Sequence, residues 1–259
     1  MAKRFFTLFL MSLVMIGCAG ASDYTPRPVE AGTTQTQMQK DSTTVIGYSV
    51  QHRPIELHRF GVGDRPVLVM ATIHGDETGA ATIGQQLINE LQRNITANGV
   101  PLAVIPIANP DGYAARMRVN ANHVDLNRNF PAGNWSTHGR STRSNNFGGA
   151  SAASEPETIA LMQTIQQLKP RLIISIHSME KPCNNYDGPA KEIAELMSKY
   201  NGFPATANIG YATPGSLGTW AGIDQHIPII TLELPRRDVD QMLWTSNRDA
   251  ILAAAAMAK

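Results

Sequence analysis

An uninterrupted apolar run at residues 67–72 constrains the fold of this chain more than any other feature. Its sequence, Val-Leu-Val-Met-Ala-Thr, is typical of a strand that is buried on both faces, as in parallel sheets. The run ends abruptly, and His74 and Glu77 follow it within a few residues. Open α/β sheets place their sites in the loops at the carboxyl ends of such strands. Imidazole and carboxylate are two ligand types of a catalytic zinc, which usually has three protein ligands, so this loop predicts part of a metal site.

The remainder of the chain alternates strand-like and helix-like segments. Apolar runs and alternating patterns predict strands, and apolar residues at helical spacing predict helices. The expected strands are residues 45–50, 55–60, 67–72, 102–108, 171–176 and 227–234, and the expected helices are residues 78–93, 155–168, 190–200 and 239–256. Asn-Pro-Asp-Gly at residues 109–112 is typical of a turn. This alternation predicts an α/β sandwich.

The first 18 residues have the features of an export signal. A basic start precedes an apolar stretch that is too short to make a comfortable membrane span, and small residues follow it. The ending Met-Ile-Gly-Cys resembles a bacterial lipoprotein box, in which Cys18 becomes the lipidated first residue of the mature protein. We therefore expect an exported, periplasmic protein with a lipid anchor in the cell envelope. The alternative is cleavage after residues 19–21, which would release a soluble periplasmic protein.

One domain is expected after a flexible tether. Residues 19–41 are rich in Thr, Gln, Pro and Ser and cannot bury enough apolar surface to order themselves. Residues 42–259 fit one catalytic domain with one core. The formal net charge of +1, without basic clusters that contain aromatic residues, argues against a nucleic-acid partner. If Cys18 is lipidated, only Cys183 remains, so the domain has no internal disulfide framework.

Two further strand ends supply candidates for the rest of the site. The apolar residues 172–176 lead directly to His177, which is the expected third metal ligand. Residues 229–232 lead to Glu233, whose apolar surroundings make an unpaired carboxylate costly. A general base that takes a proton from an activated water would explain a buried Glu at this position. The alternative is an ion pair of Glu233 with Arg236 or Arg237 at the edge of the sheet.

Five motifs together resemble, in chain order, those of the zinc carboxypeptidases of the carboxypeptidase A type. They are His-Gly-Asp-Glu at 74–77, Asn-Pro-Asp-Gly at 109–112, Asp-Leu-Asn-Arg-Asn-Phe-Pro at 125–131, Ser-Ile-His-Ser at 175–178 and Thr-Leu-Glu-Leu at 231–234. The resemblance implies a single-domain, three-layer α/β/α sandwich with a mixed, mostly parallel central sheet. It also implies one Zn²⁺ per chain, with His74, Glu77 and His177 as the metal ligands.

The same resemblance implies roles for five further residues. Glu233 corresponds to the general base and Arg118 to the arginine that polarises the scissile carbonyl. Asn127 and Arg128 correspond to the pair that holds the terminal carboxylate of the substrate, for which the planar guanidinium fork is well suited. Tyr211 corresponds to the mobile tyrosine that closes over the substrate. The implied activity is that of an exopeptidase.

A narrower resemblance is to the bacterial murein peptide amidases. It rests on the compact chain, Ser-Glu-Pro-Glu-Thr at 154–158, Cys183 followed by Tyr-Asp-Gly-Pro at 186–189, and Tyr-Ala-Thr-Pro-Gly-Ser-Leu-Gly at 211–218. It implies hydrolysis of the γ-D-glutamyl bond to meso-diaminopimelate in murein peptides. Cys183 then either lines the specificity pocket or is an inert buried thiol.

Three other functions remain as alternatives. A general metallocarboxypeptidase would act on ordinary peptides, and a preference for Arg or Lys would require an acidic pocket that the sequence does not locate. An N-acyl amino acid deacylase of the aspartoacylase or succinylglutamate deacylase type shares a similar first zinc motif and Asp-Leu-Asn-Arg. A wall-binding lipoprotein without enzymatic activity would keep only the fold. Nothing in the sequence indicates the oligomeric state.

Overall fold

The structure is a computed structural model that describes residues 41–93, 99–137, 145–236 and 240–258. The expected export signal, with Cys18, and residues 19–40 of the expected tether lie outside the described residues. All of the described residues belong to one compact unit, which runs from Met38 to Lys259. Among the helices of this described part, none has the combination of length and apolar character that crossing a bilayer requires.

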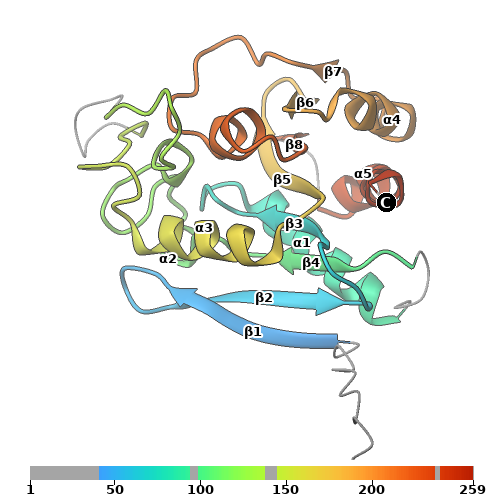
Figure 1. Ribbon diagram of the computed structural model, residues 1–259, viewed down its shortest axis with the longest axis horizontal. Coiled ribbons are helices and arrows are strands. Elements are labelled where there is room, and N and C mark those ends of the chain that lie inside the picture. The colour runs from blue at the N-terminus through green and yellow to red at the C-terminus, as the bar shows by residue number, and fades with distance from the viewer. Residues whose placement is uncertain (1–40, 94–98, 138–144, 237–239, 259) are drawn as a thin grey trace, which may run out of the picture. The chain divides into compact units, whose positions relative to one another are not determined.

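A twisted, mixed sheet forms the centre of the described residues (Figure 1). Four neighbouring strands in its middle are parallel, and the strands at both sides add antiparallel pairs. Because the middle strands are parallel, their carboxyl ends meet at one edge, where ligands bind in open α/β sheets. In spatial order the strands are β1 (Asp41–Tyr48), β2 (Pro54–Phe60), β4 (Leu102–Ile105), β3 (Val67–Ala71), β5 (Leu172–Met179), β8 (Ile229–Pro235), β6 (Cys183–Asp187) and β7 (Ala205–Thr206).

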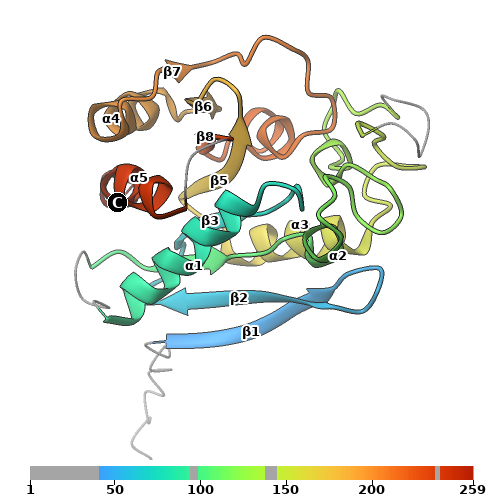
Figure 2. The same ribbon diagram turned by 180° about the vertical axis from the view of Figure 1, so that it is seen from behind.

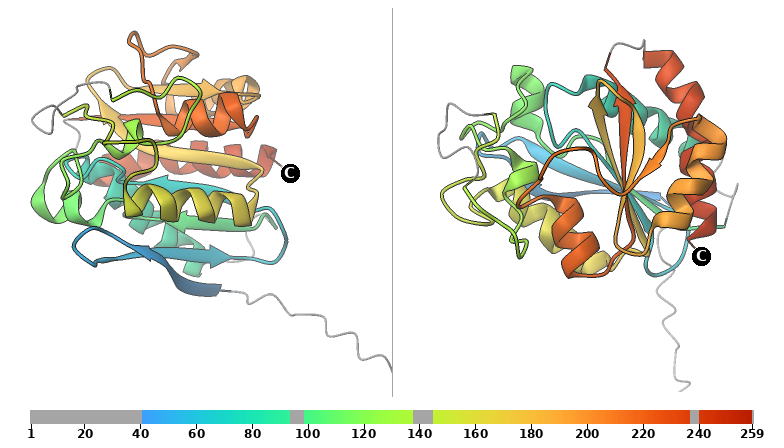
Figure 3. Two further views of the ribbon diagram at one scale, coloured as in Figure 1. Left: turned by 60° about the vertical axis from the view of Figure 1, so that its left-hand side comes forward. Right: turned by 90° about the horizontal axis from the view of Figure 1, so that it is seen from above.

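Helices cover both faces of this sheet, which Figure 2 and the view from above in Figure 3 show most clearly. One face packs against α1 (Thr78–Arg93), α4 (Lys191–Asn201) and α5 (Asp240–Met257). The other face packs against α3 (Pro156–Leu168) and the π-helix η2 (Gly218–Asp224). Two short helices, α2 (Pro110–Ala115) and the 3₁₀ helix η1 (Leu126–Arg128), lie in the connections. The expected three-layer α/β/α sandwich is confirmed.

Alternate residues of the middle strands enter two separate hydrophobic cores. In β3, Val67 and Val69 belong to the core beneath α1, α4 and α5, whereas Leu68 and Met70 belong to the core beneath α3 and η2. All five residues of β3 are buried, which explains why the sequence there is a continuous apolar run.

The structure differs from the expected elements mainly where the sequence is polar. Asn109, expected in a turn, is instead the N-cap of α2: its side chain accepts a hydrogen bond of 2.9 Å from the backbone N–H of Gly112. Pro110 then starts the helix, where its missing N–H costs nothing. The preceding strand ends at Ile105 rather than at residue 108, because Pro106 cannot donate to a strand ladder. The strand β6, Cys-Asn-Asn-Tyr-Asp, was not expected, because it has little intrinsic preference for a strand.

Gly75 holds the loop after β3 tightly against α2. A Cβ atom at this position would lie 1.9 Å from the backbone carbon of Gly112, so the Gly75→Ala variant must move one of the two backbones. We expect Gly75→Ala to lower the free energy of unfolding by about 1–3 kcal/mol and to weaken zinc binding, because the expected metal ligands His74 and Glu77 lie in the same short loop. Chemical denaturation and zinc titration measure the two effects. Gly133→Ala is the control, since its Cβ would meet nothing closer than 3.6 Å. Equal behaviour of the two variants would contradict this account.

Candidate active site

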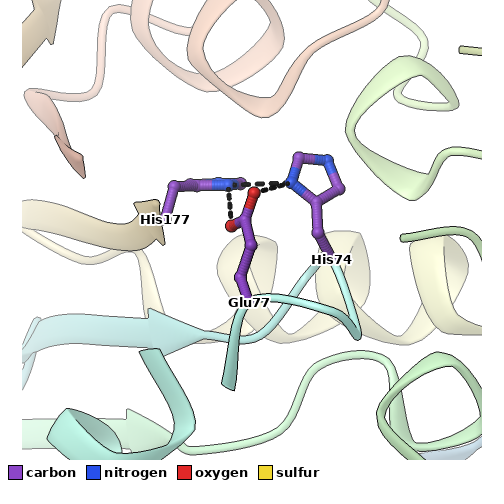
Figure 4. Close-up of side chains that lie close together, drawn as sticks. All are labelled: His74, Glu77 and His177. Carbon is purple, nitrogen blue, oxygen red and sulfur yellow. Dashed lines mark hydrogen bonds and ion pairs between the residues drawn. The ribbon is translucent and has the colours of Figure 1, made fainter. Parts of the chain in front are cut away.

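The expected metal ligands come together at the carboxyl ends of two adjacent strands. His74 and Glu77 lie in the connection between β3 and α1, and His177 lies near the end of β5, which pairs with β3. All three side chains are buried, and one ligand atom of each lies within 4.8 Å of the others. Figure 4 shows the two imidazole rings and the carboxylate turned toward one another. The structure thus brings together three residues that are separated by up to 103 positions in the sequence.

The arrangement of donor atoms fits a zinc ion. His74 Nδ1 lies 2.9 Å from Glu77 Oε1, His177 Nδ1 lies 3.1 Å from Glu77 Oε2, and the two Nδ1 atoms are 3.1 Å apart. Two buried imidazole nitrogens that approach each other and a carboxylate present lone pairs to one point, which a divalent cation would satisfy. Two histidines and one glutamate are a ligand set of catalytic zinc sites that leaves a position for water.

The opposite ring nitrogens of both histidines have partners that orient the rings. Asp125 Oδ1 lies 3.1 Å from His74 Nε2, and Ser175 Oγ lies 3.1 Å from His177 Nε2. When Nε2–H donates to these oxygens, Nδ1 carries the free lone pair that a metal requires. Asp125 begins the motif Asp-Leu-Asn-Arg, but its position in the sequence indicates no role for it. Its complete burial, which only the structure reveals, identifies it as a residue that positions His74.

The charged groups of this centre alter one another's pKa values. Burial alone would raise the pKa of Glu77, but the two adjacent histidines, His74 first, outweigh it and lower that pKa well below its usual range. Burial is likewise the largest influence on Asp125, yet His74 and Arg118 outweigh it and lower the pKa. Burial would lower the pKa of His74, but Glu77 and Asp125 together raise it. Both carboxylates are therefore ionised at neutral pH, as a metal site requires.

Glu233 lies beside the third ligand. It pairs in register with His177 of the neighbouring strand, and its side chain lines the same cavity as the metal ligands. Burial raises its pKa, and the nearby His177 opposes that shift. The alternative ion pair with Arg236 is not present, because the Arg236 guanidinium lies 3.9 Å from Glu77 instead. Arg237, the other alternative partner, lies outside the described residues.

Arg118 is held at the rim of the metal centre by two carboxylates. Its Nε donates to Asp125 Oδ2 at 3.1 Å, its Nη2 lies 3.0 Å from the same oxygen, and its Nη1 lies 3.7 Å from Glu77. Burial would lower its pKa, but Asp125 and Glu77 outweigh burial and raise it. The guanidinium is therefore a fixed positive charge in the wall of the cavity.

Arg128 is a buried guanidinium without a carboxylate partner among the described residues. It is 3% exposed, its Nη1 donates to the backbone oxygen of Asn127 at 2.7 Å, and its buried Nε atom has no hydrogen-bond partner. Burial lowers its pKa, although Asp125 opposes the shift. The neighbouring Asn127 lines the same cavity as Arg128, and its Oδ1 accepts a hydrogen bond of 2.9 Å from the N–H of Leu217. Unused donors in a cavity wall are suited to an anionic ligand group.

Tyr211 lines the same cavity from a loop between β7 and η2. Its side chain is more than half exposed, and burial together with Glu233 raises the pKa of its hydroxyl. The hydroxyl therefore stays protonated at neutral pH and can donate a hydrogen bond.

The cavity also contains an acidic residue that the sequence did not locate. Asp187 and Asn185 line the cavity from β6, on the same face as Glu233 and Thr231 of the paired strand β8. A Cβ atom at position 218 would lie 2.4 Å from Asp187 Oδ2, so Gly218 leaves room for this carboxylate. Burial raises the pKa of Asp187, and no hydrogen bond or ion pair engages its carboxylate within the described residues. The residue is therefore a candidate for binding a cationic substrate group.

Cys183 is an inert buried thiol rather than a residue of the pocket lining. It is 6% exposed and its Sγ lies 4.0 Å from the sulfur of Met179. Burial, with a contribution from Glu233, raises the pKa of the thiol to about 11, so it is protonated at neutral pH.

Two curated relatives are similar to most of the chain. Murein peptide amidase A of Vibrio campbellii is 32% identical over 220 residues, which are 81% of this chain and 84% of that protein. Murein peptide amidase A of Escherichia coli K12 is 34% identical over 184 residues, which are 67% of this chain and 73% of that protein.

Solved structures agree with the fold. The crystal structure of murein-tripeptide amidase from Escherichia coli O157 matches with a TM-score of 0.63 and 26% identity, covering 85% of this chain and 98% of that one. Carboxypeptidase A from Helicoverpa armigera has a TM-score of 0.70 at 23% identity, covering 84% and 69% of the two chains, and this likeness concerns the fold alone. The zinc carboxypeptidase family matches residues 33–208, which include His74, Glu77 and His177. The chain therefore belongs to the zinc carboxypeptidase family.

Proposed function

We propose that this protein is a zinc-dependent amidase that hydrolyses the γ-D-glutamyl–meso-diaminopimelate bond of murein peptides, with one zinc per chain. The observation that carries the proposal is that one cavity, that of the metal centre, is lined both by Arg128, a buried guanidinium whose Nε has no hydrogen-bond partner, and by Asp187, whose carboxylate has no partner among the described residues. A leaving amino acid with both an α-carboxylate and a cationic side chain fits this cavity, and diaminopimelate has both. The names of the two curated relatives support the same substrate class.

Zinc held by His74, Glu77 and His177 would supply a Lewis acid, which activates water at neutral pH and polarises a carbonyl. Glu233, beside His177, accepts the proton of the attacking water and delivers it to the leaving amine. Arg118 stabilises the negative charge that develops on the carbonyl oxygen, since its own charge is fixed by Asp125 and Glu77.

The leaving residue is held by the opposite part of the cavity. Arg128 offers a planar fork to its α-carboxylate, and the amide nitrogen of Asn127 adds a further donor. Asp187 binds the amino group at the end of its side chain, and Tyr211 closes the cavity from the solvent side. We further propose that the protein is exported to the periplasm and anchored through a lipid on Cys18, with a soluble periplasmic form as the alternative.

Mass spectrometry of the reaction products tests the proposed function. Zinc-loaded protein receives L-Ala-γ-D-Glu-meso-diaminopimelate, a panel of ordinary C-terminal peptides, and N-acyl amino acids, each with and without a chelator. Release of free diaminopimelate that a chelator abolishes is the expected result. Release only from ordinary peptides would favour a general carboxypeptidase, and release only from N-acyl amino acids would favour a deacylase.

Substitution of Asp187 tests how the leaving residue is recognised. We expect Asp187→Asn to lower kcat/KM for the diaminopimelate substrate by about 10- to 100-fold, because a hydrogen-bonded ion pair with the side-chain ammonium is lost. The matched control is the same variant acting on L-Ala-γ-D-Glu-L-Ala, in which the leaving alanine has no side-chain amino group, and there kcat/KM should fall by less than about threefold. An equal loss on both substrates would show that Asp187 has only a structural role.

A further inference from the structure

Arg236 is a third guanidinium in the cavity wall, beside Arg118 and Arg128, and the reaction described above does not use it. It follows directly after the end of β8. Its Nε donates to the backbone oxygen of Ser178 at 3.3 Å, and its Nη2 lies 3.9 Å from Glu77 Oε1. The side chain is 45% exposed, so the long contact to Glu77 contributes little to stability. The contact with Glu77 therefore does not explain why a guanidinium lies in this part of the cavity wall.

The pairing of β6 with β8 places Arg236 and Asp187 on opposite sides of Glu233. Asp187 pairs with Ile229 near the beginning of β8, and Cys183 pairs with Glu233 near its end. Arg236 lies beyond that end, next to Ser178 of β5, and Ser178 and Met179 line the cavity there. Along β8, the cavity thus contains the carboxylate of Asp187, then the catalytic centre, then the guanidinium of Arg236. The end with Asp187 is called the acidic side of the cavity, and the end with Arg236 the basic side.

Arg128 belongs to the acidic side of this arrangement. A Cβ atom at Gly215 would lie 2.3 Å from the backbone oxygen of Arg128, and one at Gly218 would lie 2.4 Å from Asp187 Oδ2. The same short segment therefore packs against both residues that hold the leaving amino acid. The side that contains Ser178, Met179 and Arg236 is left for the acyl residue, which lies on the other side of the scissile bond.

We propose that Arg236 binds the free α-carboxylate of a γ-linked glutamyl residue and thereby selects isopeptide over ordinary peptide bonds. This inference rests on the proposed function, since a γ-D-glutamyl bond leaves the α-carboxylate of the same residue free, four bonds from the scissile carbonyl carbon. The contact of Arg236 with Glu77 brings the guanidinium to the edge of the metal centre. A carboxylate only four bonds from the scissile carbonyl carbon would lie at the same place. Its Nη1 has no partner within the described residues, and the planar fork can grip a carboxylate with two parallel hydrogen bonds.

An ordinary peptide offers nothing comparable at this position, because its α-carboxyl group is consumed in the scissile bond. Arg236 would then face an uncharged backbone and lose a charge-assisted hydrogen bond. The basic side of the cavity thus distinguishes how the glutamyl residue is linked, whereas the acidic side distinguishes which amino acid leaves.

The test compares two substrates that differ at a single group. One is L-Ala-γ-D-Glu-meso-diaminopimelate, and the other carries a neutral carboxamide in place of the glutamyl α-carboxylate. We expect the unaltered, full-length protein to favour the carboxylate substrate by about 10- to 100-fold in kcat/KM. Arg236→Gln should remove this preference by slowing the carboxylate substrate, with less than about a threefold change on the carboxamide. Arg236→Lys keeps the charge without the planar fork and should restore part of the preference.

The ratio between the substrates is measured on one preparation, so a loss of folded protein cancels from it. If the preference is absent in the unaltered protein, or survives in Arg236→Gln, the inference is wrong while release of diaminopimelate still supports the proposed function. If diaminopimelate is released from neither substrate, the proposed function fails, and the inference fails with it.

Discussion

Glu233→Gln is expected to lower kcat for murein tripeptide by about 10²- to 10⁴-fold, which is the usual contribution of a general acid–base group. Gln has nearly the same shape but cannot accept the proton of the attacking water. The zinc content, measured by atomic absorption, should be unchanged, because Glu233 is not one of the three clustered ligand residues. KM should change little, since the residues proposed to hold the leaving amino acid are Arg128 and Asp187, which the substitution leaves in place.

The stability of the same variant provides a second test. Burial raises the pKa of Glu233, so its ionised form costs folding free energy at neutral pH in the zinc-free protein. Zinc-free Glu233→Gln should therefore melt at the same temperature as the unaltered protein or at a higher one. Retention of full activity in this variant would exclude Glu233 as the general base. A binding protein without enzymatic activity would show no dependence on Glu233 in any catalytic assay.

His177→Ala is expected to abolish activity together with zinc binding. Loss of a direct ligand should weaken zinc binding by more than the roughly 10- to 100-fold that loss of an outer-shell partner costs. Zinc stabilises the folded state by mass action, so the unaltered protein should show a zinc-dependent rise in melting temperature that the variant lacks. Isothermal titration with zinc and thermal denaturation with and without the metal measure both effects.

Ser175→Ala is the matched control for this experiment. Ser175 Oγ lies 3.1 Å from His177 Nε2 and orients the ring without contacting the metal position. Its loss should weaken zinc binding by at most about 10- to 100-fold, and excess zinc should restore activity. If His177→Ala binds zinc as tightly as Ser175→Ala does, His177 is not a ligand.

The middle of the sheet and the residues at its carboxyl edge could be predicted from the sequence. Continuous apolar runs identify strands that are buried on both faces, and in this chain two such runs end near the buried side chains His74 and His177. These signals are local, because each strand and the residue at its end are adjacent in sequence. The helix at residues 78–93 was predicted with the bounds that the structure has, because its apolar residues recur at helical spacing.

The floor of the cavity could not be predicted, because it depends on pairing between distant segments. Asp187 lies in a polar strand that the sequence pattern does not reveal, and only its antiparallel register with β8 places it on the same face of the sheet as Glu233. Proximity in sequence made Arg236 an alternative ion-pair partner of Glu233, beside the expected role of Glu233 as a general base. The structure instead directs its guanidinium back across the sheet edge to Ser178 and Glu77.

The alternation of residues along β8 has a consequence for how this protein can evolve. Thr231 and Glu233 face the cavity, whereas Ile230, Leu232 and Leu234 belong to the hydrophobic core on the opposite face. Point substitutions at Thr231 or on the facing residues of β6 can therefore alter substrate preference without disturbing the core. An insertion or deletion of one residue in β8 would exchange the two sets and remove activity and folding together. New specificities in this scaffold should accordingly arise by substitution, and length variation should be confined to its connecting loops.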